Sequence, residues 1–252
     1  MNTLIAFFRA LAFVVWTVLV SSVIFLLQFI FGADRPSWQP RRQWLFRCWA
    51  RGGLRVLNVD LTIKGEPPVA PYLLISNHLG YLDIVVFAAT VDATFVAKQE
   101  VAHWPFLGAV VRVLGTIFVD RTKRRDVARV NGLIEQSLGR DRAVIVFAEG
   151  TSSDGTQVLP LRPSLLSPAA GGRYPVHYAR LAYSTGPGSP DAGKAVCWWG
   201  DAEFLPHAWG LFRIRRINAL IHFGAETVTS DNRKDLAVTL HERIRSLPMS
   251  LT

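Results

Sequence analysis

A histidine and an aspartate five positions apart, His78 and Asp83, are the residues of this chain whose types and spacing best suit chemistry. They follow an apolar, strand-like run that ends at Ser76, so the imidazole is expected where a strand gives way to a helix. From the start of that helix the carboxylate can reach back to one ring nitrogen, fix the tautomer and leave the other nitrogen to take a proton. The pair predicts a general base, although a His and an Asp at this spacing also occur by chance.

A second group of polar residues follows another apolar run, in the string GTIFVDR from Gly115 to Arg121. An arginine at the end of a buried strand can hold a phosphate through two parallel hydrogen bonds, because its planar fork matches the phosphate oxygens. An ion pair between Asp120 and Arg121 is the simpler interpretation of the string when it stands alone. Lys98, which ends the run FVAK, would add positive charge to the same pocket or lie exposed.

The string FAEGTS, residues 147–152, ends a further apolar run. Its carboxylate and hydroxyls, from Glu149, Thr151 and Ser152, can hydrogen-bond a polyol or a phosphate, and Gly150 permits close approach of the backbone. An ordinary strand-to-loop turn would have a similar composition. A binding role for this string is therefore indicated only together with the other motifs.

Composition limits the class of protein. The chain has 252 residues, of which half are hydrophobic and only 19% are charged, which suits one α/β domain and excludes a disordered chain. The net charge of +9 suggests an anionic partner, either nucleic acid or an anionic lipid surface. The cysteines, Cys48 and Cys197, provide no disulfide framework, and no cluster of His, Cys and carboxylates has metal-ligand spacing, so we expect no metal and no cofactor.

The amino-terminal segment favours the lipid surface. No residue from Ala10 to Phe31 is charged, and a helix of that length can cross a hydrocarbon core of about 30 Å. No signal-peptide cleavage site follows, so we expect a retained anchor. Many arginines come after this segment and only Arg9 before it, so if the segment spans the cell inner membrane, we expect the rest of the chain on the cytoplasmic side. Basic residues crowded beside an anchor also argue against nucleic acid.

Residues 38–57 interleave aromatic and leucine side chains with arginines at helical spacing. This pattern predicts a basic amphipathic helix in the headgroup layer, the alternative being a helix packed on the domain with solvated arginines. With the anchor it would form a helical pair that either crosses the bilayer or dips into one leaflet. We therefore divide the chain into a membrane anchor and basic helix, residues 1–57, and an α/β domain, residues 58–252.

The rest of the chain alternates strand-like and helical runs, which predicts a mostly parallel central sheet flanked by helices. The expected strands cover residues 57–64, 72–76, 94–97, 116–119, 143–147, 175–183, 195–199 and 219–223. The expected helices cover residues 81–89, 105–114, 125–139 and 234–246. Residues 184–194 are rich in Gly, Pro and Ser and are expected to form a flexible loop.

Taken in order, Asn77-His78 with Asp83, then Lys98, then GTIFVDR and FAEGTS resemble the glycerolipid acyltransferase family, which includes the 1-acyl-glycerol-3-phosphate acyltransferases. The resemblance covers roughly residues 57–163. It implies an O-acyltransferase in which His78 deprotonates the acceptor hydroxyl and Asp83 orients the ring. The acceptor oxygen then attacks the thioester of acyl-CoA or acyl carrier protein directly. The substrate-binding residues so implied are Asn77, Lys98, Gly115, Arg121, Glu149, Gly150, Thr151 and Arg162.

Two positions depart from the usual pattern of that family. Ala148 stands where most members have proline, and Ser152 where many have arginine. The second change removes a positive charge from the acceptor site, and Arg162 is the candidate to replace it. We expect the acceptor to be 1-acyl-glycerol-3-phosphate, whose sn-2 hydroxyl is esterified to give phosphatidic acid.

Two alternatives remain open. The carboxy-terminal segments CWWGD, residues 197–201, and FLPHAW, residues 204–209, resemble a proteobacterial subgroup of that family, some members of which acylate lyso-ornithine lipid. This acceptor lacks phosphate, and its amine would meet Asp201, Glu203 or His207. Packing of this aromatic segment on the membrane or the core is the preferred interpretation. A non-catalytic membrane-surface binding protein with the same fold is the alternative of a different class, and it is disfavoured because a binder needs no base.

Overall fold

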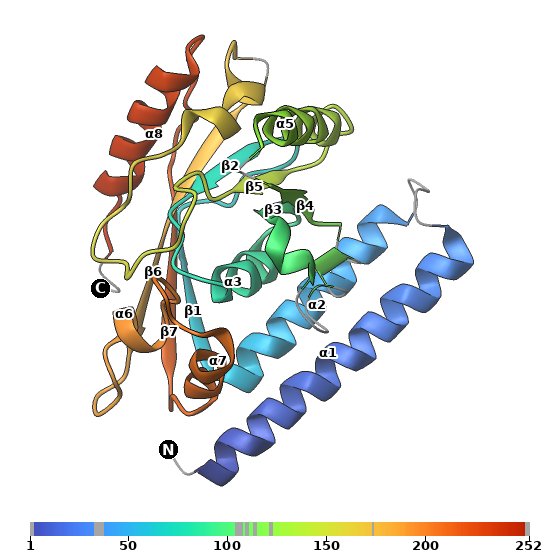
Figure 1. Cartoon of the computed structure of the whole chain (residues 1–252), viewed down its shortest axis with the longest axis vertical. Coiled ribbons are helices and arrows are strands. Elements are labelled where there is room, and N and C mark those ends of the chain that lie inside the picture. The colour runs from blue at the N-terminus through green and yellow to red at the C-terminus, as the bar shows by residue number, and fades with distance from the viewer. Residues whose placement is uncertain are drawn as a thin grey trace.

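The computed structural model describes residues 3–32, 38–103, 108, 111–112, 115–120, 123–172 and 174–249. These residues form one seven-stranded sheet with the strand order β1-β7-β6-β2-β5-β3-β4 (Figure 1). Every neighbouring pair is parallel except β6 with β7, which confirms the expected mostly parallel sheet. The strands are β1 (Val59–Lys64), β2 (Leu73–Ser76), β3 (Thr94–Lys98), β4 (Ile117–Val119), β5 (Val144–Val146), β6 (Val176–Thr185) and β7 (Ile217–Phe223).

Helices cover both faces of the sheet: α1, α2 and α3 lie on one side, and α5 and α8 on the other (Figure 1). The α-helices are α1 (Thr3–Phe31), α2 (Gln39–Leu57), α3 (Leu82–Thr90), α5 (Arg124–Leu138), α6 (Ala192–Ala195), α7 (Phe204–Phe212) and α8 (Arg233–Ser246). Short 3₁₀ turns are η1 (Gln99–His103), η2 (Pro163–Leu165) and η3 (Ser167–Ala169).

Strand β2 is buried on both faces, because it lies between β6 and β5 under the two layers of helices. Its side chains alternate, so that Leu74 joins the core beneath α2 and α3 while Leu73 and Ile75 join the core beneath α5 and α8. A central strand of this kind is rigid, which suits it to carry the loop that begins at Asn77.

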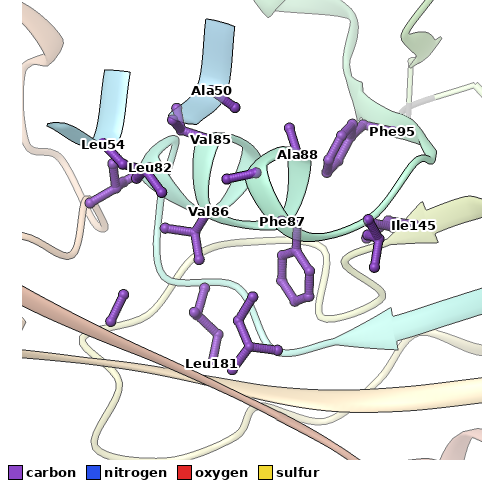
Figure 2. Close-up of a cluster of buried hydrophobic side chains, with 14 of the residues drawn as sticks. Ala50, Leu54, Leu82, Val85, Val86, Phe87, Ala88, Phe95, Ile145 and Leu181 are labelled. Carbon is purple, nitrogen blue, oxygen red and sulfur yellow. The ribbon is translucent and has the colours of Figure 1, made fainter. Parts of the chain in front are cut away.

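Helix α3 is clamped between α2 and the sheet, as Figure 2 shows. Leu82 and Val85 lie toward Ala50 and Leu54 of α2, whereas Phe87 points toward the sheet and is fully buried. Burying a side chain of this size contributes about 2–3 kcal/mol. The packing fixes the amino end of α3, where Asp83 is located.

Helix α1 packs along α2 by one face only. Trp16 Nε1 donates to Trp49 O at 3.0 Å, and Trp49 Nε1 donates to Thr17 Oγ1 at 3.1 Å. The charged residue of α1, Arg9, lies on this inner side and donates to Ile214 O at 2.8 Å. The opposite side of α1 is exposed and apolar over its whole length, and includes Leu4, Ile5, Phe8, Leu11, Val15, Leu19, Leu26, Phe29 and Ile30. Among the described helices, α1 alone is long and apolar enough to cross a membrane.

The apolar face of the predicted amphipathic helix is used inside the protein. Within residues 38–57 the side chains of Trp38, Trp49, Leu54 and Leu57 are buried, and of the large apolar side chains there only Trp44 is largely exposed. These residues contact α1 and α3. The structure therefore favours the alternative interpretation, a helix packed on the domain. The exposed apolar surface belongs to α1.

Three sequence expectations differ from the structure. Residues 196–199 are not a strand but an irregular segment after α6, because Trp198 N donates to Leu79 O outside any ladder. The expected loop 184–194 is partly ordered, since it contains the end of β6 and most of α6. Helix α7 was not expected; its Pro206 lies in the first turn, where the missing N–H costs nothing. The expected helix 105–114 lies mostly outside the described residues.

Close packing of α1 on α2 predicts an unusual response at Gly52. A Cβ at this position would overlap the Trp16 indole, so Gly52→Ala should destabilise the protein and loosen α1, although Ala is normally favoured in helices. Gly132 of α5 is the matched control, since a Cβ there meets nothing within 4 Å. Gly132→Ala should raise stability by about 0.5–1 kcal/mol. Thermal unfolding in detergent measures both, and equal stabilisation by the two would contradict the packing described.

Candidate active site

Several of the predicted site residues lie at one edge of the sheet. β2, β5, β3 and β4 are adjacent and parallel, so their carboxyl ends lie side by side (Figure 1). His78 follows β2, Glu149 follows β5, and Lys98 ends β3. Ligands of open α/β sheets bind at this edge, because the loops there converge while the strands stay rigid.

His78 and Asp83 form the expected pair. His78 Nδ1 lies 2.7 Å from Asp83 Oδ2, and the carboxylate is completely buried. Because a carboxylate accepts, Nδ1 carries the proton and Nε2 is left as an acceptor. The side chain of His78 is 23% exposed, and no hydrogen bond to Nε2 occurs among the described residues. The imidazole therefore presents a free basic nitrogen at the surface of the site.

The buried carboxylate of Asp83 is held by further donors. Its Oδ2 also accepts from Leu79 N at 2.7 Å and Gly80 N at 3.1 Å, and its Oδ1 accepts from the Tyr183 hydroxyl at 2.9 Å. Burial and the neighbouring carboxylate raise the pKa of Tyr183, so its hydroxyl stays protonated and donates. Tyr183 comes from β6, and no local pattern in the sequence could have identified it.

The plane of the His78 ring is set by Phe147. The two rings stack with centroids 4.4 Å apart and an interplanar angle of 15°. Ser153 N, directly after the FAEGTS segment, also donates to His78 O at 2.9 Å, so residues 147–153 hold both the ring and the backbone of this residue. Ring rotation is thus limited by Asp83 on one side and Phe147 on the other.

The carboxylate of Glu149 is buried and accepts hydrogen bonds from the backbone. Its Oε2 accepts from His78 N at 2.9 Å and its Oε1 from Leu159 N at 2.8 Å. Burial raises the pKa of Glu149 to about 7, partly opposed by these two hydrogen bonds. Both carboxylate oxygens are therefore used within the protein, and Glu149 shapes the site by fixing two loops.

Gly150 and Arg162 lie together. Gly150 has φ of 80°, and a Cβ there would overlap the Arg162 side chain. Arg162 N donates to Ala148 O at 2.7 Å, which ties this arginine to the FAEGTS segment, while its side chain is exposed. Thr151 is exposed beside it. The structure thus places Arg162 against Gly150, two positions before Ser152.

Asn77 is placed as a structural residue. Its Nδ2 donates to Leu181 O at 2.9 Å and its Oδ1 accepts from Leu181 N at 2.7 Å. These bonds continue the pairing of β2 with β6 beyond Ser76, and the side chain is 2% exposed. Asn77 therefore fixes the start of the loop that carries His78 instead of facing a ligand.

The residues around GTIFVDR are described in part. Arg121 lies outside the described residues, so its predicted phosphate contact is left as a prediction. Lys98 is exposed at the end of β3, and Asp120 forms an ion pair with Lys123 at 2.9 Å. Gly115, with φ of 78°, lies against the Arg42 guanidinium of α2, a neighbour that sequence spacing did not indicate.

The carboxy-terminal aromatic segment packs on the loop that carries His78. The Tyr81 ring contacts Trp198, Phe204 and His207, and Trp198 O accepts from Ser152 Oγ at 2.5 Å. His207 Nε2 lies 3.1 Å from Cys197 O and so carries the proton, while its Nδ1 accepts from the Tyr81 hydroxyl at 2.8 Å. Three residues were considered as partners of an ornithine amine. Both ring nitrogens of His207 are used in hydrogen bonds within the protein, whereas Asp201 and Glu203 are exposed.

A base at the carboxyl edge of a parallel sheet, supported by a buried carboxylate, suits a reaction in which a substrate hydroxyl is the nucleophile, since no serine or cysteine bonds to His78 Nε2 among the described residues. The family model described as Acyltransferase matches residues 60–177. Lyso-ornithine lipid O-acyltransferase of Brucella abortus is 34% identical over 88% of this chain and 87% of that protein. The 1-acyl-sn-glycerol-3-phosphate acyltransferase of Neisseria meningitidis is 28% identical over 78% of each. The chain belongs to the glycerolipid acyltransferase family.

The fold agrees with that assignment. The crystal structure of the 1-acyl-sn-glycerophosphate acyltransferase from Thermotoga maritima superposes with a TM-score of 0.73, over 100% of this chain and 98% of that one, at 17% identity. The protein is an O-acyltransferase of the lysophospholipid type, as the resemblance implied.

The contact between Tyr183 and Asp83 predicts a catalytic effect of a buried hydroxyl. Tyr183→Phe removes one hydrogen bond to a charged group, which is worth about 1.5–3 kcal/mol. We expect kcat for acyl transfer to fall roughly 10-fold or more while the KM of the acyl donor changes little. Tyr178→Phe, on the same strand, is the control, since no hydrogen bond to its hydroxyl occurs among the described residues. Equal kcat values for the two variants would contradict the role of Tyr183.

The raised pKa of Glu149 predicts a pH dependence of stability. The folded state holds this proton more tightly than the unfolded state, whose carboxyl has the ordinary pKa of 4.5. The stabilisation is therefore complete below pH 4.5 and is lost as pH rises to about 7, by up to about 3 kcal/mol.

Glu149→Gln should abolish this loss, at the expense of stability at all pH values because its amide nitrogen faces a backbone N–H. Chemical denaturation at several pH values measures the difference from wild type, with exposed Glu135→Gln as the control. A difference that does not shrink between pH 4.5 and 7 would be inconsistent with a raised pKa.

Proposed function

We propose that the protein transfers a fatty acyl group from a thioester donor, acyl-CoA or acyl carrier protein, to the hydroxyl of a lysolipid, with His78 as general base. The observation that carries the proposal is the free Nε2 of an imidazole whose Nδ1 is held by buried Asp83. No further cofactor is needed, because the thioester supplies the activated acyl group.

The reaction proceeds by direct transfer. His78 Nε2 takes the proton of the acceptor hydroxyl as its oxygen attacks the thioester carbonyl, and the carboxylate of Asp83 stabilises the imidazolium that forms. The attack forms the ester C–O bond and a tetrahedral intermediate, and collapse of this intermediate restores the carbonyl and breaks the C–S bond. The imidazolium returns its proton to the thiolate that leaves, so that the base is regenerated.

We favour lyso-ornithine lipid as the acceptor over the 1-acyl-glycerol-3-phosphate expected from the sequence. Ser152 replaces an arginine, and its hydroxyl donates to Trp198 O, so it adds no charge for a phosphate. The lyso-ornithine lipid enzymes of Brucella abortus and Rhizobium meliloti, both 34% identical, support this order. The ornithine carboxylate would meet Arg162, and its amine Asp201 or Glu203.

A specific observation keeps 1-acyl-glycerol-3-phosphate as the second candidate. Arg162 lies directly against Gly150, where it can restore the positive charge lost at Ser152. Lys98 is exposed at the same edge of the sheet, and Arg121 is predicted to lie there as well. Together these residues would bind a phosphate monoester.

The membrane location of the protein follows from α1. Its exposed side is apolar from end to end, and its other side is packed along α2 and tied to Ile214 by Arg9. Crossing the bilayer would separate α1 from these partners, so we propose that it lies in one leaflet of the inner membrane with the domain on the cytoplasmic side.

The first experiment offers both acceptors to the purified protein in detergent, with labelled acyl-CoA and acyl carrier protein as donors. His78→Ala should reduce transfer by at least about 100-fold, the range expected for loss of a general base. His222→Ala, on β7, is the control with an unchanged site. Near-normal transfer by His78→Ala would refute the mechanism, and transfer to neither acceptor would refute the substrate assignment.

Ser152→Arg tests the choice of acceptor in the same assay. Restoring the arginine should raise kcat/KM for 1-acyl-glycerol-3-phosphate relative to lyso-ornithine lipid by roughly 10-fold, the value of one charge-assisted hydrogen bond. Ser246→Arg adds the same charge to exposed α8 and serves as the control. An unchanged ratio would contradict the role given to position 152.

A further inference from the structure

A cavity of about 730 Å³ lies where β6 ends and β7 begins. Its walls are the amino end of α1, the end of α2, the turn at residues 187–190 and the turn at residues 213–215. Because β6 runs parallel to β2, the cavity lies at the same edge of the sheet as the loop that carries His78. None of the residues assigned to the acyl-transfer site lines it.

The cavity is strongly cationic. Arg9, Arg213 and Arg215 line it, and no carboxylate is among its described lining residues. None of the three forms an ion pair within the described chain; the nearby carboxylate of Asp60 pairs with Arg216 instead. Guanidinium groups gathered without counter-charge repel one another, and an anion between them removes that cost. Their planar forks match the oxygens of a phosphate.

The turn that carries two of these arginines is held in place by side chains. Arg9 Nη1 donates to Ile214 O at 2.8 Å, and Asn58 Nδ2 donates to Arg215 O at 2.7 Å. On the opposite wall, Thr185 Oγ1 donates to Pro190 O at 2.6 Å. A ligand would therefore have to order only the ends of two exposed side chains, which keeps the entropic cost of binding low.

The cavity adjoins the apolar surface of α1. Ile5 lines it and is 48% exposed, and Leu4 and Phe8 continue the exposed apolar side from there. A ligand that fits both surfaces has an anionic head and an apolar body. A soluble acidic protein would have to cover the leucine and phenylalanine with its polar surface, which makes it the less suitable partner.

We propose that this cavity binds the phosphate headgroup of an anionic phospholipid belonging to the bilayer in which α1 lies. The site is additional to the acyl-transfer site and rests only on the membrane location proposed for α1. Since both sites lie at one edge of the sheet, a bound headgroup would hold that edge, and with it His78, toward the membrane surface.

The test is co-sedimentation of the full-length protein with phosphatidylcholine vesicles, with or without phosphatidylglycerol. Wild type should bind the phosphatidylglycerol vesicles more tightly. Arg213→Ala/Arg215→Ala should lose this added affinity by roughly 30-fold, from about 1 kcal/mol for each arginine near the surface. Lys234→Ala/Arg245→Ala removes the same charge from α8, far from α1, and should keep most of the added affinity (Figure 1).

A charge-conserving variant separates a built site from general attraction. Arg213→Lys/Arg215→Lys should lose several-fold in affinity if the guanidinium forks hold a phosphate. Full retention of affinity by this variant, or equal losses by the two alanine variants, would overturn the proposal. Thermal stabilisation of wild type by inorganic phosphate alone, matching that by phosphatidylglycerol vesicles, would assign the cavity to free phosphate and overturn it too.

Acyl transfer in neutral detergent is measured alongside and should be unchanged in Arg213→Ala/Arg215→Ala, which shows that the variant is folded. A raised KM for acyl carrier protein with unchanged vesicle binding would reassign the cavity to that acidic protein and overturn the lipid proposal. If the headgroup proposal fails, acyl transfer can still be measured. If the proposed acyl transfer fails, vesicle binding can still be measured, so the two failures are distinguishable.

Discussion

The buried carboxylate of Asp83 is the constraint on which the site depends. A charge without solvent is tolerated only when its oxygens are satisfied, and here donors come from His78, Leu79, Gly80 and Tyr183. Three of these lie in one loop and the fourth on β6, so a single carboxylate fixes the loop, the tautomer of the base and the position of a strand. The buried side chain of Glu149 likewise holds two loops, since its oxygens accept from two backbone N–H groups, one of them that of His78.

The sequence predicted what depends on local order along the chain. The spacing of His78 and Asp83 encodes a strand-to-helix loop, and the alternation of apolar runs encodes the parallel sheet that brings Glu149 and Lys98 to the same edge. Tyr183 was not predictable, because its contact with Asp83 spans 100 positions and depends on β6 pairing beside β2. Residues 195–199 have strand composition, yet Trp198 N donates to Leu79 O, in the loop that carries His78, rather than to a neighbouring strand.

The two amino-terminal helices use their apolar surfaces differently, since that of α2 is buried in the protein and the outer side of α1 is exposed. The apolar residues of α2 are used in packing on α1 and α3, although their pattern was that of a headgroup helix. Periodicity gives the face of a helix but not what covers it, and only the tertiary structure shows that the face of α2 is buried and the outer face of α1 exposed. Because α2 contacts both α1 and α3, the exposed apolar helix α1 is linked through α2 to the helix that holds Asp83.

The hydrogen bond from Tyr183 to Asp83 has a consequence for synthesis of the chain. The loop with His78 leaves the ribosome long before β6, and until residue 183 has emerged and β6 has joined the sheet, the carboxylate lacks one of its donors. The base is therefore fully assembled only in a nearly complete chain.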